Sequence, residues 1–146
     1  MKKLFILALI AIATGTSAFA APSSTKATAH FAITFSKAKN VSWISGGKFE
    51  KVNFVLNDEN LTAFYDEYGD LIGTTKKVAF DKLPKAAIET ITTEFTFPEY
   101  QVRDCIEFVN DKNEKKYYTS FETENATVIL EIALNGRVSV FSGTER

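Results

Sequence analysis

The order of amphipathic segments most constrains the fold of this chain, because a helix-like segment followed by four strand-like segments occurs twice. The first helical pattern begins with Thr28 as N-cap and places Phe31, Phe35 and Ala38 on one face. The second has proline in its first turn, at Leu83-Pro84, and an apolar stripe formed by Ala87, Ile88, Ile91 and Phe95. Each helix is short and needs a sheet to pack against.

Alternating apolar and polar residues predict strands after each helix. They lie near residues 41–45, 51–57, 61–66 and 71–80, and then near 101–109, 116–123, 126–134 and 137–142. Turn glycines Gly69 and Gly136 stand 67 residues apart, and Asn135-Gly136 favours a type I′ hairpin. The pattern predicts an α+β domain over residues 28–146, with pseudo-repeats at about 28–80 and 81–146. Its two tandem helix-plus-four-stranded antiparallel units form a continuous sheet with the helices on one face.

The first twenty residues have the pattern of a bacterial export signal. Lys2 and Lys3 precede an apolar run from Leu4 to Ala13, and Ala18-Phe19-Ala20 supplies the small residues that signal peptidase accepts. The apolar run is too short to span a bilayer of ~30 Å. We therefore expect cleavage after Ala20, a flexible leader over residues 21–27, and a periplasmic or secreted protein without stable membrane insertion.

Composition argues against several classes of partner. Residues 1–20 hold two of the 17 basic residues and none of the 18 acidic ones, so the remaining chain has a net charge of −3. This balance disfavours nucleic acid, which binds clustered lysine and arginine. A single cysteine, Cys105, excludes an intramolecular disulfide. Thirteen phenylalanines indicate a thick core for a chain of this length.

Three motifs in order resemble one family of exported bacterial proteins. Phe35-Ser-Lys-Ala-Lys-Asn-Val-Ser-Trp43 resembles the helix-to-strand motif of PepSY-like, beta-lactamase-inhibitor-like (BLIP-like) periplasmic proteins. The aromatic strand and acidic turn over residues 63–69, and the helix from Leu83-Pro84 to Phe97-Pro98, are similar to the same family. The resemblance implies tandem α+β units and no catalytic role, and it supplies no catalytic or binding residues.

Catalytic chemistry has few candidate residues in this chain. The single histidine, His30, lies in the first turn of the first predicted helix and is interpreted as a solvated surface residue. Cys105 alternates with Ile106 and Phe108 and is interpreted as a small buried hydrophobe. A reactive thiol remains the alternative for Cys105, because Arg103 is two residues away on the same strand face. We predict that the protein is not an enzyme.

No metal or cofactor is predicted. Asp66, Glu67 and Asp70 crowd one turn, but Tyr68 and Gly69 interrupt the alternating oxygen ligands of a calcium loop. Gly46-Gly47 lacks the lysine and helix that follow a phosphate-binding loop. We interpret both segments as structural turns.

One candidate site remains, on the sheet face that points away from the helices. If alternation turns Val52/Phe54/Leu56, Leu61/Ala63/Tyr65 and Val128/Leu130/Ile132 toward the helices, the opposite face carries four apolar residues among polar ones, namely Val55, Phe64, Tyr118 and Ile129. Apolar side chains inside a polar rim are typical of a protein-binding surface, although strands buried on both sides would show the same pattern. On the binding hypothesis, serine at Phe64 and Tyr118 should abolish binding and leave folding intact.

The leading hypothesis is a non-enzymatic module that binds an envelope protein through this face. The alternative is a small-molecule carrier or sensor with a pocket between helices and sheet. The pattern does not predict an oligomeric state.

Overall fold

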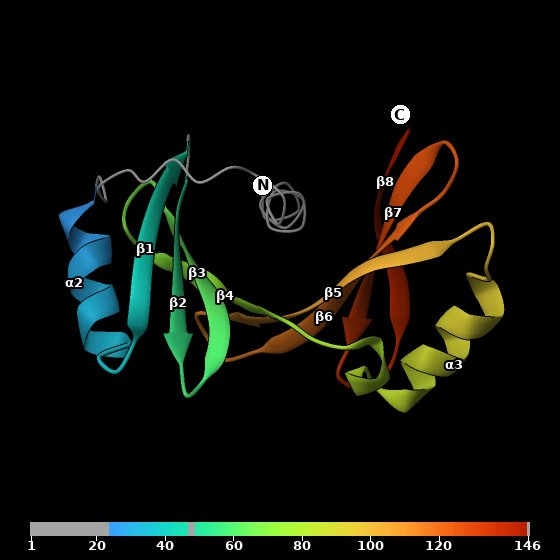
Figure 1. The fold of residues 1–146 in the computed structure, drawn as a ribbon, viewed down its shortest axis with the longest axis horizontal. Helices are drawn as coiled ribbons and strands as arrows, with labels where there is room; N and C mark the ends of the chain where they lie inside the picture. Colours follow the sequence, from blue (N-terminus) through green and yellow to red (C-terminus); the bar gives the residue numbers. More distant parts are fainter. Residues whose placement is uncertain (1–23, 47–48, 146) are drawn as a thin grey trace. The chain divides into compact units, whose positions relative to one another are not determined.

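The computed structural model describes residues 24–46 and 49–145 (Figure 1). The predicted signal peptide, its cleavage site and Gly47 lie outside these residues. The strands follow one another in chain order in one open antiparallel sheet, so the predicted α+β class and the continuous sheet are confirmed. The elements are α2 (Thr25–Thr34), β1 (Lys39–Gly46), β2 (Phe49–Leu56), β3 (Glu59–Asp66), β4 (Leu71–Lys77), α3 (Lys85–Glu94), β5 (Gln101–Asn110), β6 (Lys115–Glu122), β7 (Ala126–Ala133) and β8 (Val138–Glu145).

The described residues form two compact units, each with its own core. The α2 unit consists of residues 24–46, 49–76 and 108–114, and the α3 unit consists of residues 77–107 and 115–145. Strand β5 contributes residues to both units.

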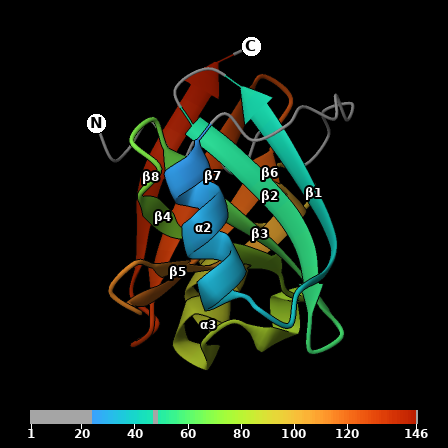
Figure 2. The same cartoon turned by 90° about the vertical axis from the view of Figure 1, so that its left-hand side faces the viewer.

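In the α2 unit, one face of α2 packs on β2 and β3 (Figure 2). Ala27 and Phe31 are one helical turn apart and meet Val52, Phe54 and Tyr65. The Phe31 ring lies edge-on to Phe54, with 5.0 Å between centroids. Full burial of a large apolar side chain contributes about 1.5–3 kcal/mol, so these rings dominate the stability of the unit.

In the α3 unit, the buried stripe of α3 is formed by Ala87 and Ile91, as the sequence predicted. These residues pack in a core with Cys105, Phe121, Leu130 and Ile132. Phe95 stacks on Phe121 at a centroid distance of 5.7 Å. The strand residues predicted to face a helix do so in both units.

The first helix begins earlier than predicted. Its N-cap is Ser24, whose hydroxyl accepts a hydrogen bond from the Ala27 N–H at 3.2 Å, so Thr28 lies inside the helix. Thr28 instead donates its hydroxyl to the Ser24 carbonyl. Both residue types favour helix starts, and the earlier cap lets Ala27 join the core. Residues 24–27 are therefore not part of a flexible leader.

The fourth strand is shorter than predicted and ends at Lys77. A single 3-10 turn over Phe80–Lys82 follows it and leads into Pro84, the N-cap of α3. Leu83 is buried in the core of the α3 unit. Phe80, the last residue of the predicted strand, is therefore the first residue of this turn.

The Asn135-Gly136 turn is not type I′. That turn needs positive φ at both residues, whereas Gly136 has φ 85° and Asn135 is not among the positive-φ residues. The Ala133 N–H donates to the Arg137 carbonyl at 3.0 Å, which makes a three-residue loop that ends on a left-handed glycine. Gly69 takes the same conformation, at φ 81°, in the turn after β3.

Candidate binding face

Each unit has one sheet face that points away from its helix. We call this sheet face the far face. In the α2 unit, strand register builds a row across this face. Lys51 lies opposite Ile44 of β1 and Phe64 of β3, and Phe64 lies opposite Gly73 of β4. Directly opposed residues of antiparallel strands point to the same side, so these side chains are neighbours.

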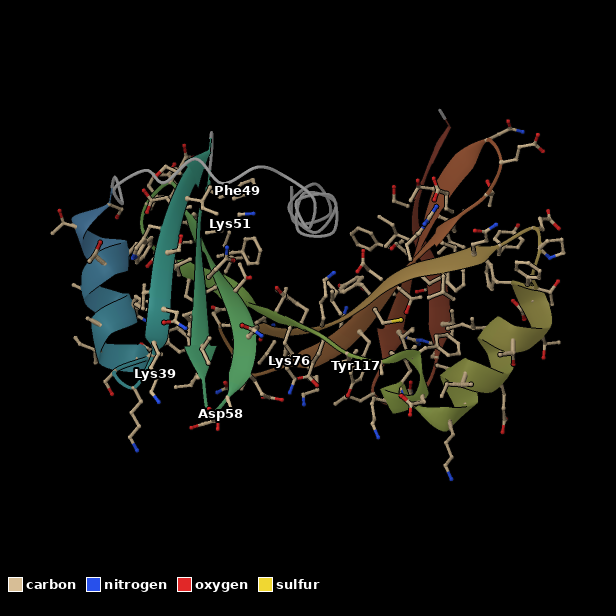
Figure 3. The ribbon with its side chains drawn as sticks, viewed as in Figure 1. Lys39, Phe49, Lys51, Asp58, Lys76 and Tyr117 are labelled. Carbon is tan, nitrogen blue, oxygen red and sulfur yellow. The ribbon has the colours of Figure 1, made fainter. Side chains whose placement is uncertain are left out.

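The row continues into an aromatic patch. Phe49 is two residues before Lys51 on β2, and its ring lies 6.4 Å from that of Phe64. Figure 3 shows Phe49 and Lys51 on the side of β2 that points away from α2. The Phe108 ring occupies the space over Gly73, where a Cβ atom would come within 2.6 Å of it. A glycine at position 73 therefore lets this ring approach the sheet.

The next row of the same face is polar. Asn53 accepts a hydrogen bond from the Thr62 hydroxyl at 2.7 Å, and Ser42 lies opposite Asn53 on β1. Val55 lies beyond this row, opposite Asn60 and Lys39. Val55 therefore shares the far face with Phe64 but is not in the same patch.

In the α3 unit, the far face centres on Tyr118. Its hydroxyl donates to Glu131 Oε2 at 2.8 Å, and Lys116 Nζ donates to Glu131 Oε1 at 2.8 Å. The Tyr118 ring lies edge-on to Phe141 at 5.4 Å. Ile129 is a diagonal neighbour of Tyr118, because it lies opposite Ser120 on β6.

These contacts shift the protonation equilibria of the pair. Burial raises the pKa of Tyr118, and its bond to Glu131 raises it further. Burial pushes the pKa of Glu131 upward, but hydrogen bonds from Lys116 and Tyr118 outweigh this effect and lower it. The Glu131 carboxylate thus has its charge partners within the unit.

Of the two interpretations of the far face, burial on both sides applies to three of its four predicted residues. Phe64 is 3 %, Tyr118 1 % and Ile129 5 % exposed, while Val55 is half-buried. Alternation shows which face a side chain points to, but it does not show how far neighbouring rings cover it. Serine at Phe64 or Tyr118 would therefore disturb packing, and such a variant cannot serve as a silent probe of binding.

Sequence reasoning missed the side chains that remain accessible around Phe64. Ile44, Phe49 and Lys51 are half-buried on the far face of the α2 unit. Phe49 and Lys51 have the same parity as Val55 in β2, and Ile44 alternates with core-facing Trp43 in β1, so alternation contained the signal. The register that places Ile44 and Lys51 beside Phe64 could not be derived from alternation alone.

The catalytic candidates take structural positions. His30 is exposed, and its Nδ1 lies 3.0 Å from the Tyr65 hydroxyl while its Nε2 lies 3.3 Å from Thr34 Oγ1. Cys105 is buried, as predicted, and receives a 3.5 Å hydrogen bond from the Thr119 hydroxyl. Burial raises the pKa of the Cys105 thiol, which disfavours the reactive thiolate.

Hydrogen bonds within the turn hold the acidic segment after β3. Asp66 Oδ1 accepts hydrogen bonds from the Tyr68 and Asp70 N–H groups, both at 2.9 Å. The Asp70 carboxylate pairs with Lys26 at 2.6 Å. Over residues 24–46 and 49–145, no group of three or more metal-ligating side chains is placed to hold an ion.

Comparison with known proteins shows similarity at the level of structure. No family model matches this chain, and no curated protein sequence matches it either. A BLIP-like protein from Bacteroides fragilis has a TM-score of 0.68 at 13% identity, over 86% of this chain and 88% of that one. A DUF2874 family protein from Bacteroides ovatus has a TM-score of 0.69 at 14% identity, over 86% and 89% of the two chains.

A third structure, named as a periplasmic protein of Bacteroides eggerthii, has a TM-score of 0.68 at 9% identity and covers 86% of this chain and 90% of that one. The predicted resemblance to BLIP-like proteins is thus confirmed for the fold. The predicted connection to PepSY proteins stays a prediction. None of the helices in the described part of the chain is long and apolar enough to cross a membrane.

Proposed function

We propose that this chain is an exported, non-enzymatic binding module that engages a protein partner through the far face of its α2 unit. The observation that carries this proposal is the patch formed by Ile44, Phe49, Lys51 and Phe64. It is apolar and aromatic, it lies on a sheet face without a helix from its own unit, and it borders a polar row. An apolar centre beside a polar rim is the usual anatomy of a protein interface.

The far face of the α2 unit is a better candidate than that of the α3 unit. Around Tyr118 the charged groups satisfy one another through Glu131 and Lys116. Around Phe64 the half-buried groups include the apolar Ile44 and Phe49 beside Lys51, and the nearby Asp66 carboxylate accepts hydrogen bonds within its own turn. Buried Phe64 and Phe108 form the floor of the patch, and a partner would contact the half-buried residues around them.

A capture experiment with matched variants tests this function. The bait is the protein purified from a bacterial host that exports the full chain, beside its Ile44→Ser/Phe49→Ser variant and its Ile33→Ser variant. Ile33 is 81 % exposed on α2 and serves as the control for loss of an apolar group. We expect wild type and Ile33→Ser to capture the same envelope protein, and the double variant to lose it.

The captured protein is then purified and its affinity for the three baits is measured. Equal affinity for all three would contradict the proposed face. Greater loss with Ile33→Ser would move the interface to the helix side.

A small-molecule carrier has less support. In the α2 unit, the space between helix and sheet holds the rings of Phe31, Phe35 and Phe54, with centroids 4.9–5.1 Å apart. The Trp43 ring lies edge-on to the Phe31 ring, with 5.5 Å between their centroids. A ligand there would have to displace close ring contacts.

We also infer export by cleavage after Ala20 and construction from two tandem units. Fold similarity to a protein named as periplasmic supports the first inference. Mass spectrometry of the exported chain should find Ala21 at its N-terminus. The second is supported by equivalent contacts, because Gly69 approaches Ala27 at the start of α2 and Gly136 approaches Ala87 near the start of α3.

A further inference from the structure

Lys51 differs from the other lysines of the sheet in its environment. It lies in the middle of β2, between Ile44 and Phe64, two residues after Phe49. The side chain is half-buried, and this burial alone lowers the pKa of its ammonium group. A partly desolvated charge is costly unless a partner compensates it.

Four other lysines of the sheet have such a partner, and Lys39 of β1 is exposed to solvent. Lys76, Lys77, Lys115 and Lys116 each have a carboxylate oxygen within 2.8–3.1 Å. Among the described residues, no hydrogen bond or ion pair is found for the Lys51 ammonium. The nearest acidic position in the register is Asp66, opposite Phe49, and its carboxylate already caps the turn after β3.

We propose that Lys51 binds a carboxylate side chain of the protein partner, within a segment whose flanking residues are aromatic or aliphatic. This inference rests on the proposed function and specifies the chemistry of the partner. The carboxylate would pair with the Lys51 ammonium, and the flanking groups would pack on Ile44 and Phe49. Charge complementarity argues for this occupant, because the patch has a cation without a carboxylate and apolar groups on two sides of it.

A partner segment of this kind also explains the position of the charge. An ion pair beside apolar groups is shielded from water, so it discriminates strongly between acidic and neutral partners. A lysine at the polar row around Asn53 would be solvated and would discriminate less. Lys51 is therefore placed where charge can set specificity.

The test uses two blocked peptides, acetyl-Phe-Glu-Phe-amide and acetyl-Phe-Gln-Phe-amide, titrated into ¹⁵N-labelled protein purified from an exporting host. We expect the glutamate peptide to bind about ten-fold more tightly than the glutamine peptide. The shifted amide signals should cluster on β2 and β3 around Lys51. The Lys51→Met variant keeps an unbranched side chain but removes its charge, and it should bind both peptides equally, with the affinity that wild type has for the glutamine peptide.

Lys39→Met is the matched control, because Lys39 is an exposed lysine at the start of neighbouring β1 (Figure 3). This variant should keep the ten-fold preference. Equal affinity of wild type for the two peptides, or an unchanged preference in Lys51→Met, would overturn the proposal. Tighter binding of 3-phenylpropionate than of the glutamate peptide would also overturn it, because the site would then serve a small carboxylate.

Failure of this inference can be distinguished from failure of the proposed function. If the captured partner binds wild type and Lys51→Met equally but loses affinity for Ile44→Ser/Phe49→Ser, the far face stands and carboxylate recognition is wrong. If all these variants bind the partner equally, both proposals are wrong.

Discussion

At the scale of single residues, Phe64 determines which experiments can probe the far face. Its ring contacts Phe49 and is 3 % exposed. Replacement of a buried phenylalanine by a small residue typically costs about 3–5 kcal/mol through lost burial and the cavity that remains.

We therefore predict that Phe64→Ser lowers the free energy of unfolding by about 3 kcal/mol or more, measured by urea denaturation. Ile33→Ser, at a site that is 81 % exposed, should change it by less than ~0.5 kcal/mol. Equal midpoints for Phe64→Ser and wild type would show that the ring contributes little to the core, and the variant could then serve as a binding probe.

The second prediction at this scale concerns the effect of Tyr65 on the pH dependence of stability. Burial raises the pKa of its hydroxyl to about 12, whereas the pKa of a tyrosine in an unfolded chain is about 10. Between these values the unfolded chain has lost its proton and the native protein has kept it, so stability falls as pH rises. The contribution of Tyr65 is complete below pH ~10 and decreases by up to ~3 kcal/mol by pH ~12.

The Tyr65→Phe variant should remove this part of the alkaline loss. The measurement is the free energy of unfolding of both proteins from pH 8 to 12, with differences taken at each pH. Parallel curves would mean that Tyr65 ionises as easily in the native protein as in the unfolded chain.

At the scale of elements, the two turn glycines allow each turn to lie close to the first residues of a helix. A Cβ atom on Gly136 would come within 2.7 Å of the Ala86 Cβ and 3.2 Å of the Ala87 nitrogen. At Gly69 it would meet the Ala27 nitrogen at 3.0 Å. Both glycines also have positive φ, which strains any residue with a side chain.

Gly69→Ala and Gly136→Ala should each lower the free energy of unfolding by at least ~1–3 kcal/mol, read from thermal or urea denaturation. Gly143→Ala is the control, since a Cβ there meets nothing within 4 Å. Losses of similar size at Gly69 and Gly136 are expected if the two units are equivalent. A loss at only one of them would argue against the tandem inference.

The elements also show where prediction from sequence succeeds. Alternation identified the helix-facing residues correctly, because Val52, Ala63 and Leu130 are all buried in cores beneath a helix. The start of the first helix was wrong, because Ser24 and Thr28 are both good N-caps and only packing of Ala27 decides between them.

The turn at Gly136 and the burial of Phe64 could not be predicted for a related reason. Asn-Gly by itself favours a type I′ turn. In the structure, Gly136 lies against the start of α3, and the turn is a three-residue loop. Burial of Phe64 depends on Gly73 and Phe108, which are distant in sequence and meet only through strand register. Patterns within one strand contain no information on such neighbours.

At the scale of the whole molecule, every strand belongs to one continuous sheet, and each unit covers one sheet face with a helix. Solved structures of similar fold match more than four fifths of this chain at 9–14% identity. The shared feature is thus the backbone architecture, and the proposed function assigns specificity to side chains such as Ile44, Phe49 and Lys51. This is why the central claim concerns the far face of the α2 unit.

Site-specific photo-crosslinking in the exporting cell tests that claim most directly. A photoreactive benzoyl-phenylalanine is placed at Ile44, on the far face, or at Ile33, on the exposed side of α2. We predict a discrete crosslinked protein from position 44 and none from position 33. A crosslink from position 33 alone, or no crosslink from either, would contradict binding through the far face.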